Sequence, residues 1–386
     1  MANNILDYIM WRGDLSFAKS PVNEVDNLIL CRLSYLPMDG IVSESFQESI
    51  TVAEAADLFF ADAGQSERLK KSFVIQKEDI PLFRALADSE RFGALRLSGY
   101  ANQIDYDTEK QFSCITIELA KDSYFLAFRG TDDTLVGWKE DFNMTFLPVV
   151  PAQLDAVRYL EAAAASLTGM LQLGGHSKGG NLAAYASVCC RDDLKPRIAA
   201  VYLNDSPGFQ AGMLADERYR QIRDRLHVYV PQSSVVGMML EHEEDYIVVQ
   251  STQHGLFQHD LYTWNVMCTG FVYLETVTSG SHFLDRTLKE WILQLDADER
   301  EFFINTLFEI LSATNARTLP EMTEGWLKKA GAVINAYKQI DKSTKSLLNQ
   351  TLSALVQAGR NNLHLLKPSQ NSLRNNEFQH KIIEKR

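Results

Sequence analysis

The 386-residue sequence lacks the features that mark membrane-spanning, nucleic-acid-binding and disulfide-stabilised proteins. It has no run of about 18 apolar residues, so we expect no membrane span. Acidic residues outnumber basic ones by 50 to 38, and the net charge of −12 argues against nucleic acid as the main partner. Five cysteines, an odd number in a long chain, do not form a disulfide framework, and none has the CxxC spacing of a zinc site.

The N-terminal residues 1–7 also lack the basic and apolar segments of a signal peptide. Apolar residues make up 46% of the chain and charged residues 23%, values typical of a soluble globular protein. We therefore expect a cytoplasmic protein of one large domain or two ordinary ones, long enough to bury a sizeable core.

Four regions of different character follow one another along the chain. Residues 1–95 predict short helices, and we expect this helical segment to pack on the core. Residues 96–280 alternate between strand and helix patterns, which indicates an α/β core with a mostly parallel sheet. Residues 281–368 predict four helices that form a cap or platform. Residues 369–386 are polar, and we expect a disordered tail.

Within these regions the periodicity predicts individual elements. The expected strands cover residues 112–119, 124–128, 171–173, 198–203, 226–230 and 245–250. The expected helices of the first two regions cover residues 25–36, 51–60, 80–87, 151–167 and 181–187. The first two strands read as a hairpin, and the strand at 245–250 is expected to be the last.

The segment 171–187 contains the strongest functional signal. Residues 175–179 read Gly-His-Ser-Lys-Gly, between a short apolar strand and a helix rich in alanine. This context is that of a nucleophile elbow, in which a strained turn presents the serine hydroxyl above the sheet. Gly175 and Gly179 flank the serine where a Cβ would clash. We predict that Ser177 is a nucleophile; the alternative is an ordinary glycine-rich turn.

The base that activates this serine should lie near the end of the core. A serine hydroxyl needs a base to remove its proton, and the chain order in this fold is serine, acid, histidine. His254 and His259 both follow the last expected strand, and we favour His259 because it lies later in the loop and Trp264 can anchor it. His282 is a third candidate, and the alternative is that all are ordinary loop histidines.

Asp205 is the candidate for the acid that orients the histidine. It directly follows the strand after the elbow helix, where residues 206–208 turn the chain. The alternative is that Asp205 only hydrogen-bonds this turn, as aspartates commonly do. Asp260 is adjacent to His259 and points away from it in a regular backbone, and Asp245 opens the last expected strand at the wrong end.

An oxyanion hole supplies two donors about 3 Å from the developing charge. The backbone N–H of Lys178 directly follows the nucleophile and is the first donor. The second should come from the loop at residues 128–133, where Gly130 permits a tight turn and both the N–H and the hydroxyl of Thr131 can face the site. The alternative for this loop is a simple strand-end turn.

These segments together resemble the fungal-type triacylglycerol lipases over roughly residues 110–265. Residues 127–141 contain Phe-Arg-Gly-Thr followed by Trp and Asp, as those lipases do, and 175–179 resembles their Gly-His-Ser-x-Gly elbow. The resemblance assigns the oxyanion hole to the residue after the glycine, which is Thr131 here. Their Ser-Pro after the next strand and their final histidine followed by an aromatic have counterparts in Ser206-Pro207 and His259.

One segment departs from this pattern. The fungal-type lipases carry the acid near a Val-Pro after the following strand, whereas residues 230–234 read Val-Pro-Gln-Ser-Ser and contain no carboxylate. The whole chain more closely resembles a bacterial lipase-like α/β-hydrolase family of unestablished function, whose Gly-His-Ser-Lys-Gly-Gly-Asn-Leu-Ala and Gln-His-Asp…Trp patterns both occur here. This resemblance implies a serine hydrolase without indicating its substrate.

Lys178 has an unusual position for a lysine, inside the elbow. Its ammonium group could attract an anionic substrate such as a phospholipid or an acidic ester. We favour the alternative, in which the side chain is solvated or forms a salt bridge, with Glu140 and Asp141 as candidate partners.

The sequence therefore predicts an α/β-hydrolase core with helical regions at both ends, and an esterase or lipase that works through an acyl-enzyme. Ser177 attacks, His259 is the base, Asp205 orients it, and the N–H groups of Thr131 and Lys178 hold the oxyanion. No metal or organic cofactor is needed, and the partner is a small-molecule or lipid ester. An acyltransferase or thioesterase with the same site is one alternative. A non-enzymatic binding protein is another, and the missing carboxylate is its best support.

Overall fold

The computed structural model describes residues 3–62, 76–132, 134–240, 246–314, 316–318, 321 and 326–366, without the side chains of 256 and 326–329. These residues contain a nine-stranded sheet in the order β1-β2-β3-β4-β5-β6-β7-β8-β11. Its strands are β1 (Ile50–Thr51), β2 (Arg96–Asp105), β3 (Lys110–Ala120), β4 (Ser123–Phe128), β5 (Met170–His176), β6 (Ile198–Asn204), β7 (Leu226–Pro231), β8 (Tyr246–Val249) and β11 (Tyr273–Leu274). β9 (Val266–Met267) and β10 (Gly270–Phe271) form a separate small ribbon.

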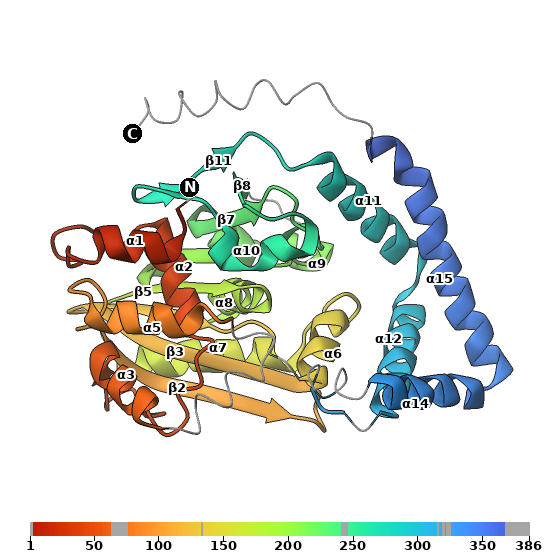
Figure 1. Cartoon of the computed structure of the whole chain (residues 1–386), viewed down its shortest axis with the longest axis horizontal. Coiled ribbons are helices and arrows are strands. Elements are labelled where there is room, and N and C mark those ends of the chain that lie inside the picture. The colour runs from red at the N-terminus through yellow and green to blue at the C-terminus, as the bar shows by residue number, and fades with distance from the viewer. Residues whose placement is uncertain are drawn as a thin grey trace.

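The sheet is parallel from β4 to β8, and its outer strands pair antiparallel on both sides. Helices cover both of its faces, as the element arrangement in Figure 1 shows. This architecture confirms the predicted α/β-hydrolase-like fold. In such a sheet the loops at the carboxyl ends of the parallel strands meet at one edge, and this edge is where the candidate site lies.

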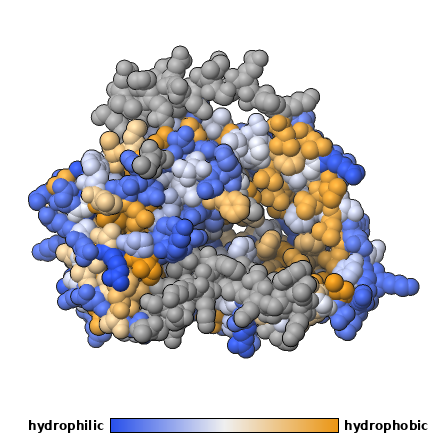
Figure 2. Space-filling view, viewed as in Figure 1, coloured by the Kyte–Doolittle hydropathy of each residue, from blue (hydrophilic) through white to orange (hydrophobic). Residues whose placement is uncertain are grey.

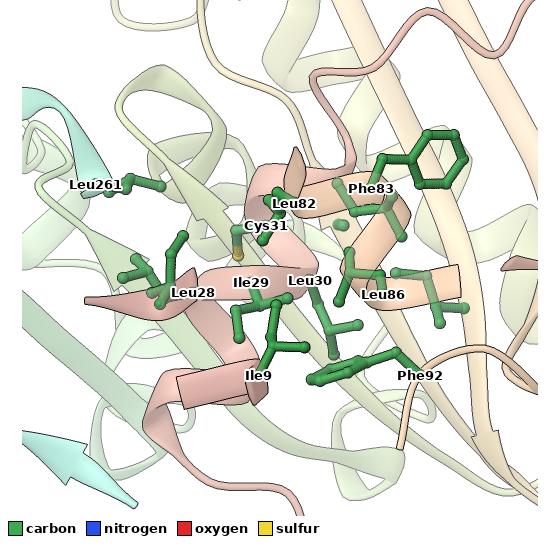
Figure 3. Close-up of a cluster of buried hydrophobic side chains, with 14 of the residues drawn as sticks. Ile9, Leu28, Ile29, Leu30, Cys31, Leu82, Phe83, Leu86, Phe92 and Leu261 are labelled. Carbon is green, nitrogen blue, oxygen red and sulfur yellow. The ribbon is translucent and has the colours of Figure 1, made fainter. Parts of the chain in front are cut away.

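The first face of the sheet is covered by the N-terminal helices α1 (Ile5–Arg12), α2 (Glu24–Leu33), α3 (Val52–Ala61) and α5 (Asp79–Asp88). Figure 3 shows Leu28, Ile29, Leu30 and Cys31 of α2 at the centre of this layer, with side chains of the neighbouring helices around them. Every residue of α2 is buried, and Asn23 and Asp26 close its N-terminus with a capping box. Each fully buried Leu or Ile contributes roughly 1.5–3 kcal/mol, so this helix is an integral part of the core that packs on the sheet.

Two buried ion pairs fix α2 in this position. Asp26 accepts hydrogen bonds from both Nε and Nη2 of Arg91, at 2.8 and 2.5 Å. Arg32, in the last turn of α2, makes the same paired contact with Asp79, at 2.6 and 2.5 Å. Buried charges are tolerated only when they are paired and hydrogen-bonded, so these contacts define how α2 meets α5 and the chain after it.

The second face is covered mainly by α7 (Pro151–Ser166) and α8 (Lys178–Cys189), with the short α9 (Ala211–Leu214) and α10 (Glu217–Arg220) at its margin. Ala183, Ala184 and Ala186 of α8 are fully buried against the sheet. Their small side chains allow the helix to lie close to the strands, as expected for the helix after a nucleophile elbow.

The C-terminal helices α11 (Ser279–Gln294), α12 (Ala297–Ser312), α14 (Trp326–Gln339) and α15 (Lys342–Asn362) lie beside the core, on the right of Figure 1. α12 packs against α6 (Leu135–Asn143) and the turn after it, where Phe146, Ile304 and Phe308 form a small separate core. In the part of the chain that the structure describes, no helix is long and apolar enough to cross a bilayer.

Most of the longer elements lie where the sequence predicts them, and several were missed, among them α1, the short helices α9 and α10, and the β9–β10 ribbon. Strand β2, helix α6 and strand β11 have no counterpart among the predicted elements. The prediction that the strand at 245–250 is the last one is wrong, because β11 pairs with β8 and extends the sheet. β11 has only two residues, too few for a periodic pattern to develop. The tail at 369–386 lies outside the described residues.

Candidate active site

Ser177 occupies the sharp turn between β5 and α8. Its backbone has φ +58° and ψ −135°, a conformation that residues with a side chain rarely adopt. The turn is held by hydrogen bonds from Ser177 N–H to the Asn204 carbonyl, at 3.0 Å, and from Gly180 N–H to the Ser177 carbonyl, at 3.1 Å. Such strain persists only where the surrounding structure enforces it, and it is the geometry of a nucleophile elbow.

The glycines beside Ser177 are required by close packing of the backbone. A Cβ on Gly175 would lie 2.1 Å from the carbonyl carbon of Gly179. A Cβ on Gly179 would lie 2.1 Å from the carbonyl oxygen of Phe128, at the end of β4. The same two glycines therefore close the elbow and bring it against the loop that begins at Arg129.

Asp205 and His259 lie in direct contact, although 54 residues separate them. Oδ2 of Asp205 is 2.6 Å from Nδ1 of His259. Asp205 is buried at the end of β6 with a positive φ of 46°, and its N–H donates to the Tyr229 carbonyl of β7 at 2.8 Å. His254 is exposed at the start of the same loop, and His282 lies in α11. Of the three predicted histidines, the structure places His259 beside the predicted acid.

The other carboxylate oxygen of Asp205 is bound by the loop after β7. Oδ1 accepts a hydrogen bond from Oγ of Ser234 at 2.5 Å and from the Gly237 N–H at 3.0 Å. This loop is the one in which no carboxylate was found in the sequence. It supports an acid that comes from the preceding strand.

The segment that carries His259 is anchored by buried polar contacts. The short 3₁₀-helix η4 (Gly255–His259) ends at this histidine. The indole N–H of the fully buried Trp264 donates to the Gln258 carbonyl at 2.9 Å. The side chain of Gln258 accepts the Ser233 N–H at 2.8 Å, which links η4 to the loop after β7. The backbone that carries His259 is therefore held both by Trp264 and by the loop after β7.

A second histidine, which the sequence interpretation did not single out, lies beside His259. The ring centroids of His176 and His259 are 4.2 Å apart. Burial lowers the pKa of His176 well below its ordinary value, so this ring is neutral at neutral pH. Its Nδ1 is 3.0 Å from the hydroxyl of Tyr35, which directly follows α2. The contact between Tyr35 and His176 could not be predicted from local patterns, because the two residues are 141 positions apart in the sequence.

The loop predicted to form the oxyanion hole touches the nucleophile. A Cβ on Gly130 would lie 3.1 Å from the Cβ of Ser177 and 2.4 Å from the hydroxyl of Tyr35. Thr131, the next residue, is buried and its hydroxyl donates to Oδ2 of Asp141 on α6. Burial raises the pKa of Asp141 to about 6, against the opposing effect of the nearby Lys178 ammonium.

The Lys178 side chain points away from solvent. Only 1% of it is exposed, and Nζ lies 3.0 Å from Oε2 of Glu140 and 3.8 Å from Oδ1 of Asp141. Nζ also donates to the Gln111 carbonyl at 3.1 Å. The favoured ion pair with Glu140 and Asp141 is thus present, and the ammonium group is buried and not solvated.

The contact between Oδ2 of Asp205 and Nδ1 of His259 can orient the imidazole for acid–base chemistry. The surrounding groups that the structure describes do not suggest a metal site. Among the described ranges, no group of three or more His, Cys, Asp or Glu side chains is arranged to hold a metal ion.

Comparison with known proteins matches the chain to a family and, distantly, to solved lipase structures. A family model described as Mbeg1-like matches residues 86–309, more than half of the chain. No curated protein matches the sequence. The crystal structure of M37 lipase is 14% identical, with a TM-score of 0.32, over 48% of this chain and 69% of that one. A deletion mutant of Rhizomucor miehei lipase in its propeptide complex is also 14% identical, with a TM-score of 0.33, over 49% and 72%.

Proposed function

The chain belongs to the Mbeg1-like family, and we propose that it is a serine hydrolase that cleaves carboxylic esters through a covalent acyl-enzyme. The observation that carries this proposal is the 2.6 Å contact between Asp205 and His259, next to an elbow that holds Ser177 at a positive φ. A buried carboxylate on one ring nitrogen leaves the other nitrogen of His259 to accept a proton.

The reaction follows from these positions. Nε2 of His259 takes the hydroxyl proton of Ser177 as Oγ attacks the ester carbonyl, and Asp205 stabilises the imidazolium that forms. The N–H groups of Thr131 and Lys178 donate to the oxyanion of the tetrahedral intermediate. The imidazolium then protonates the leaving alcohol, and the C–O bond breaks to give the acyl-enzyme. Water, deprotonated by His259, hydrolyses the acyl-enzyme and restores Ser177.

His176 supports this cycle because its ring stays uncharged beside His259. The ring of His259 becomes positively charged in each half-reaction, and a second charged imidazole 4.2 Å away would oppose that charge. Burial keeps His176 neutral, so its ring can pack against His259 without this cost.

The substrate is a small-molecule or lipid ester. The non-enzymatic alternative depended on the absence of a carboxylate after β7, and Asp205 from β6 supplies one to His259 instead. An acyltransferase or thioesterase would use the same residues, and product analysis with added alcohols or thioesters separates these activities from ester hydrolysis.

The proposal is tested with purified variants and a p-nitrophenyl ester. Ser177→Ala and His259→Ala are expected to abolish hydrolysis while the thermal midpoint stays within a few degrees. His254→Ala is the matched control, since His254 is exposed in the same loop and should leave the rate unchanged. Near-wild-type hydrolysis by a folded Ser177→Ala protein, or an inactive His254→Ala protein, would contradict the assignment.

A further inference from the structure

Charge is distributed unevenly along this acidic chain. Residues 326–386 contain eleven lysines and arginines but only three acidic residues, a net charge of +8 in a chain whose total is −12. Residues 1–325 therefore carry −20. Between residues 325 and 376 the only acidic residue is Asp341, and its carboxylate caps the N-terminus of α15. A basic C-terminal region on an acidic protein indicates an anionic partner.

Helix α15 has two apolar stripes, of which only one packs on the protein. Its first stripe includes Leu348, Thr351 and Ala358, which are buried, and α15 packs on α11. The second stripe contains Leu352, Val356 and Leu363, whose spacings of four and seven residues place them on one helical face. These side chains are 48%, 54% and 54% exposed.

Basic side chains border the exposed stripe. Lys345 lies seven residues before Leu352 and therefore on the same face, and Lys342 and Arg360 lie beside it and are exposed. Nζ of Lys345 donates to the Lys338 carbonyl at 2.8 Å, which joins the end of α14 to this face.

On α14 the exposed side chains continue the pattern. Tyr337 and Lys338 follow Ile334 by three and four residues, so all three lie on one helical face, and all three are exposed. Nζ of Lys345 lies 5.7 Å from the Tyr337 ring centroid. Figure 2 shows hydrophobic residues on the right half of the molecule, where α11 and α15 lie in the same view, with hydrophilic residues along the outermost right edge. We call this surface the α14–α15 face. It comprises Ile334, Tyr337, Lys338, Lys342, Lys345, Leu352, Val356, Arg360 and Leu363.

α15 packs on α11 and α14 packs on α12, and these two supporting helices are attached to the core near the candidate site. At the start of α11, Oγ of Ser281 donates to the carbonyl of Ser234, the residue whose hydroxyl binds Asp205, at 2.6 Å. Further along, α12 packs on α6, which carries Asp141, and the Leu135 N–H donates to the Arg317 carbonyl at 2.9 Å. The α14–α15 face is therefore joined to the loops around the site through α11 and α12.

We propose that the α14–α15 face docks on an anionic lipid bilayer surface. Exposed Leu and Val side chains beside lysines and arginines, without acidic residues between them, are the composition of an interfacial amphipathic helix. Each basic residue near an anionic leaflet contributes about 1 kcal/mol, and the apolar stripe adds burial in the headgroup region. The acidic remainder of the chain is repelled by the same surface, so the charge asymmetry also orients the protein.

The experiment is cosedimentation of the full chain with phosphatidylcholine vesicles, with and without about one third phosphatidylglycerol. The protein is expected to bind the anionic vesicles in about 0.1 M salt and to be released in about 1 M salt. Lys342→Gln with Arg360→Gln, and separately Leu352→Ser with Val356→Ser, should each weaken the partition coefficient about thirtyfold.

Matched controls change equally exposed residues elsewhere. Leu58→Ser with Leu154→Ser removes two side chains that are 53% and 46% exposed on α3 and α7, and should leave vesicle binding unchanged. All variants should hydrolyse a soluble p-nitrophenyl ester at the wild-type rate, which shows that they fold. Because binding is read without hydrolysis, an inactive wild-type protein would overturn the esterase proposal and leave this one standing.

Four outcomes would overturn the inference. One is equal binding to neutral and anionic vesicles, and another is no binding to either. The third is a size-exclusion shift from dimer to monomer in the α14–α15 variants without vesicle binding, which would assign the face to a second copy of the chain. Retention of a short DNA duplex in place of vesicles would assign it to nucleic acid.

Discussion

The hydroxyl of Ser234 donates a hydrogen bond of 2.5 Å to the carboxylate of Asp205. The two residues come from loops after adjacent parallel strands, β7 and β6. The loop after β7 is where the fungal-type lipases, which this chain resembles, carry their acid. Here that loop provides a neutral donor to Asp205, which follows the strand before it and which we propose as the acid.

Replacing Ser234 should therefore remove one of the hydrogen bonds that hold Asp205 and leave the carboxylate itself in place. A hydrogen bond to a charged group is worth roughly 1.5–3 kcal/mol, and Ser234→Ala leaves Oδ1 of Asp205 with the Gly237 N–H alone. We expect ester hydrolysis to fall about tenfold. Ser233→Ala is the control, since its hydroxyl contacts Thr278 at 3.0 Å instead. Equal rates for the two variants in a steady-state assay would argue against a supporting role.

Asp205→Asn tests the acid itself. The amide keeps the shape and can still accept from Ser234, but its NH₂ group favours the wrong tautomer of His259, and such a change costs about 10⁴ in rate in a serine protease. We expect a loss of this size in the acylation rate with a nearly unchanged thermal midpoint. Asp260→Asn is the control, because that carboxylate caps the turn at Tyr262. A small rate change with a clear loss of stability would mean that Asp205 serves only the turn.

Lys178 should contribute to stability and not to substrate choice. Lys178→Met leaves the buried Glu140 without its counter-charge, and breaking such a pair costs about 3–5 kcal/mol. Adding Glu140→Gln should recover part of this loss in a double-mutant cycle measured by urea unfolding. The variant should hydrolyse anionic and neutral esters in the wild-type ratio. A selective loss of anionic esters would show that the ammonium reaches the substrate.

The raised pKa of Asp141 makes stability depend on pH in a defined direction. Its pKa is about 6 instead of 3.8, mainly because burial disfavours the charged form. The stability that this group contributes is present at acidic pH and is lost as the pH rises through 6. Relative to Asp141→Asn, which does not titrate, wild type should lose at most about 3 kcal/mol between pH 4 and pH 7. Urea unfolding at both pH values measures this, and a constant or opposite difference would contradict it.

Local patterns in the sequence predicted the elbow because its geometry is encoded locally. Gly175 and Gly179 are needed for contacts within a few residues, and the alanine-rich helix follows at once. His259 and Asp205 were chosen from chain order in the fold, and no periodicity could show that their side chains meet. The role of Ser234 could not be predicted, because a serine hydroxyl gives no signal until its acceptor is known.

The missed elements have local physical reasons. In β2, Gly99 has φ +60° and the pairing with β3 shifts between Ser98 and Ala101, so a bulge interrupts the alternation of side chains. Helix α6 is only nine residues long and has Gly137 in its first turn, which weakens its helical pattern. Tyr35 lies beside His176 only because α2 packs across the sheet.

The most direct test of the account is labelling of the wild-type protein with a fluorophosphonate probe, followed by peptide mass spectrometry. An activated serine displaces fluoride from the probe and keeps the phosphonyl group on Oγ. We predict a single labelled site at Ser177, no labelling of Ser177→Ala, and strongly reduced labelling of His259→Ala. Absence of labelling in folded wild-type protein, or labelling at a different serine, would contradict the assignment of Ser177 as the nucleophile.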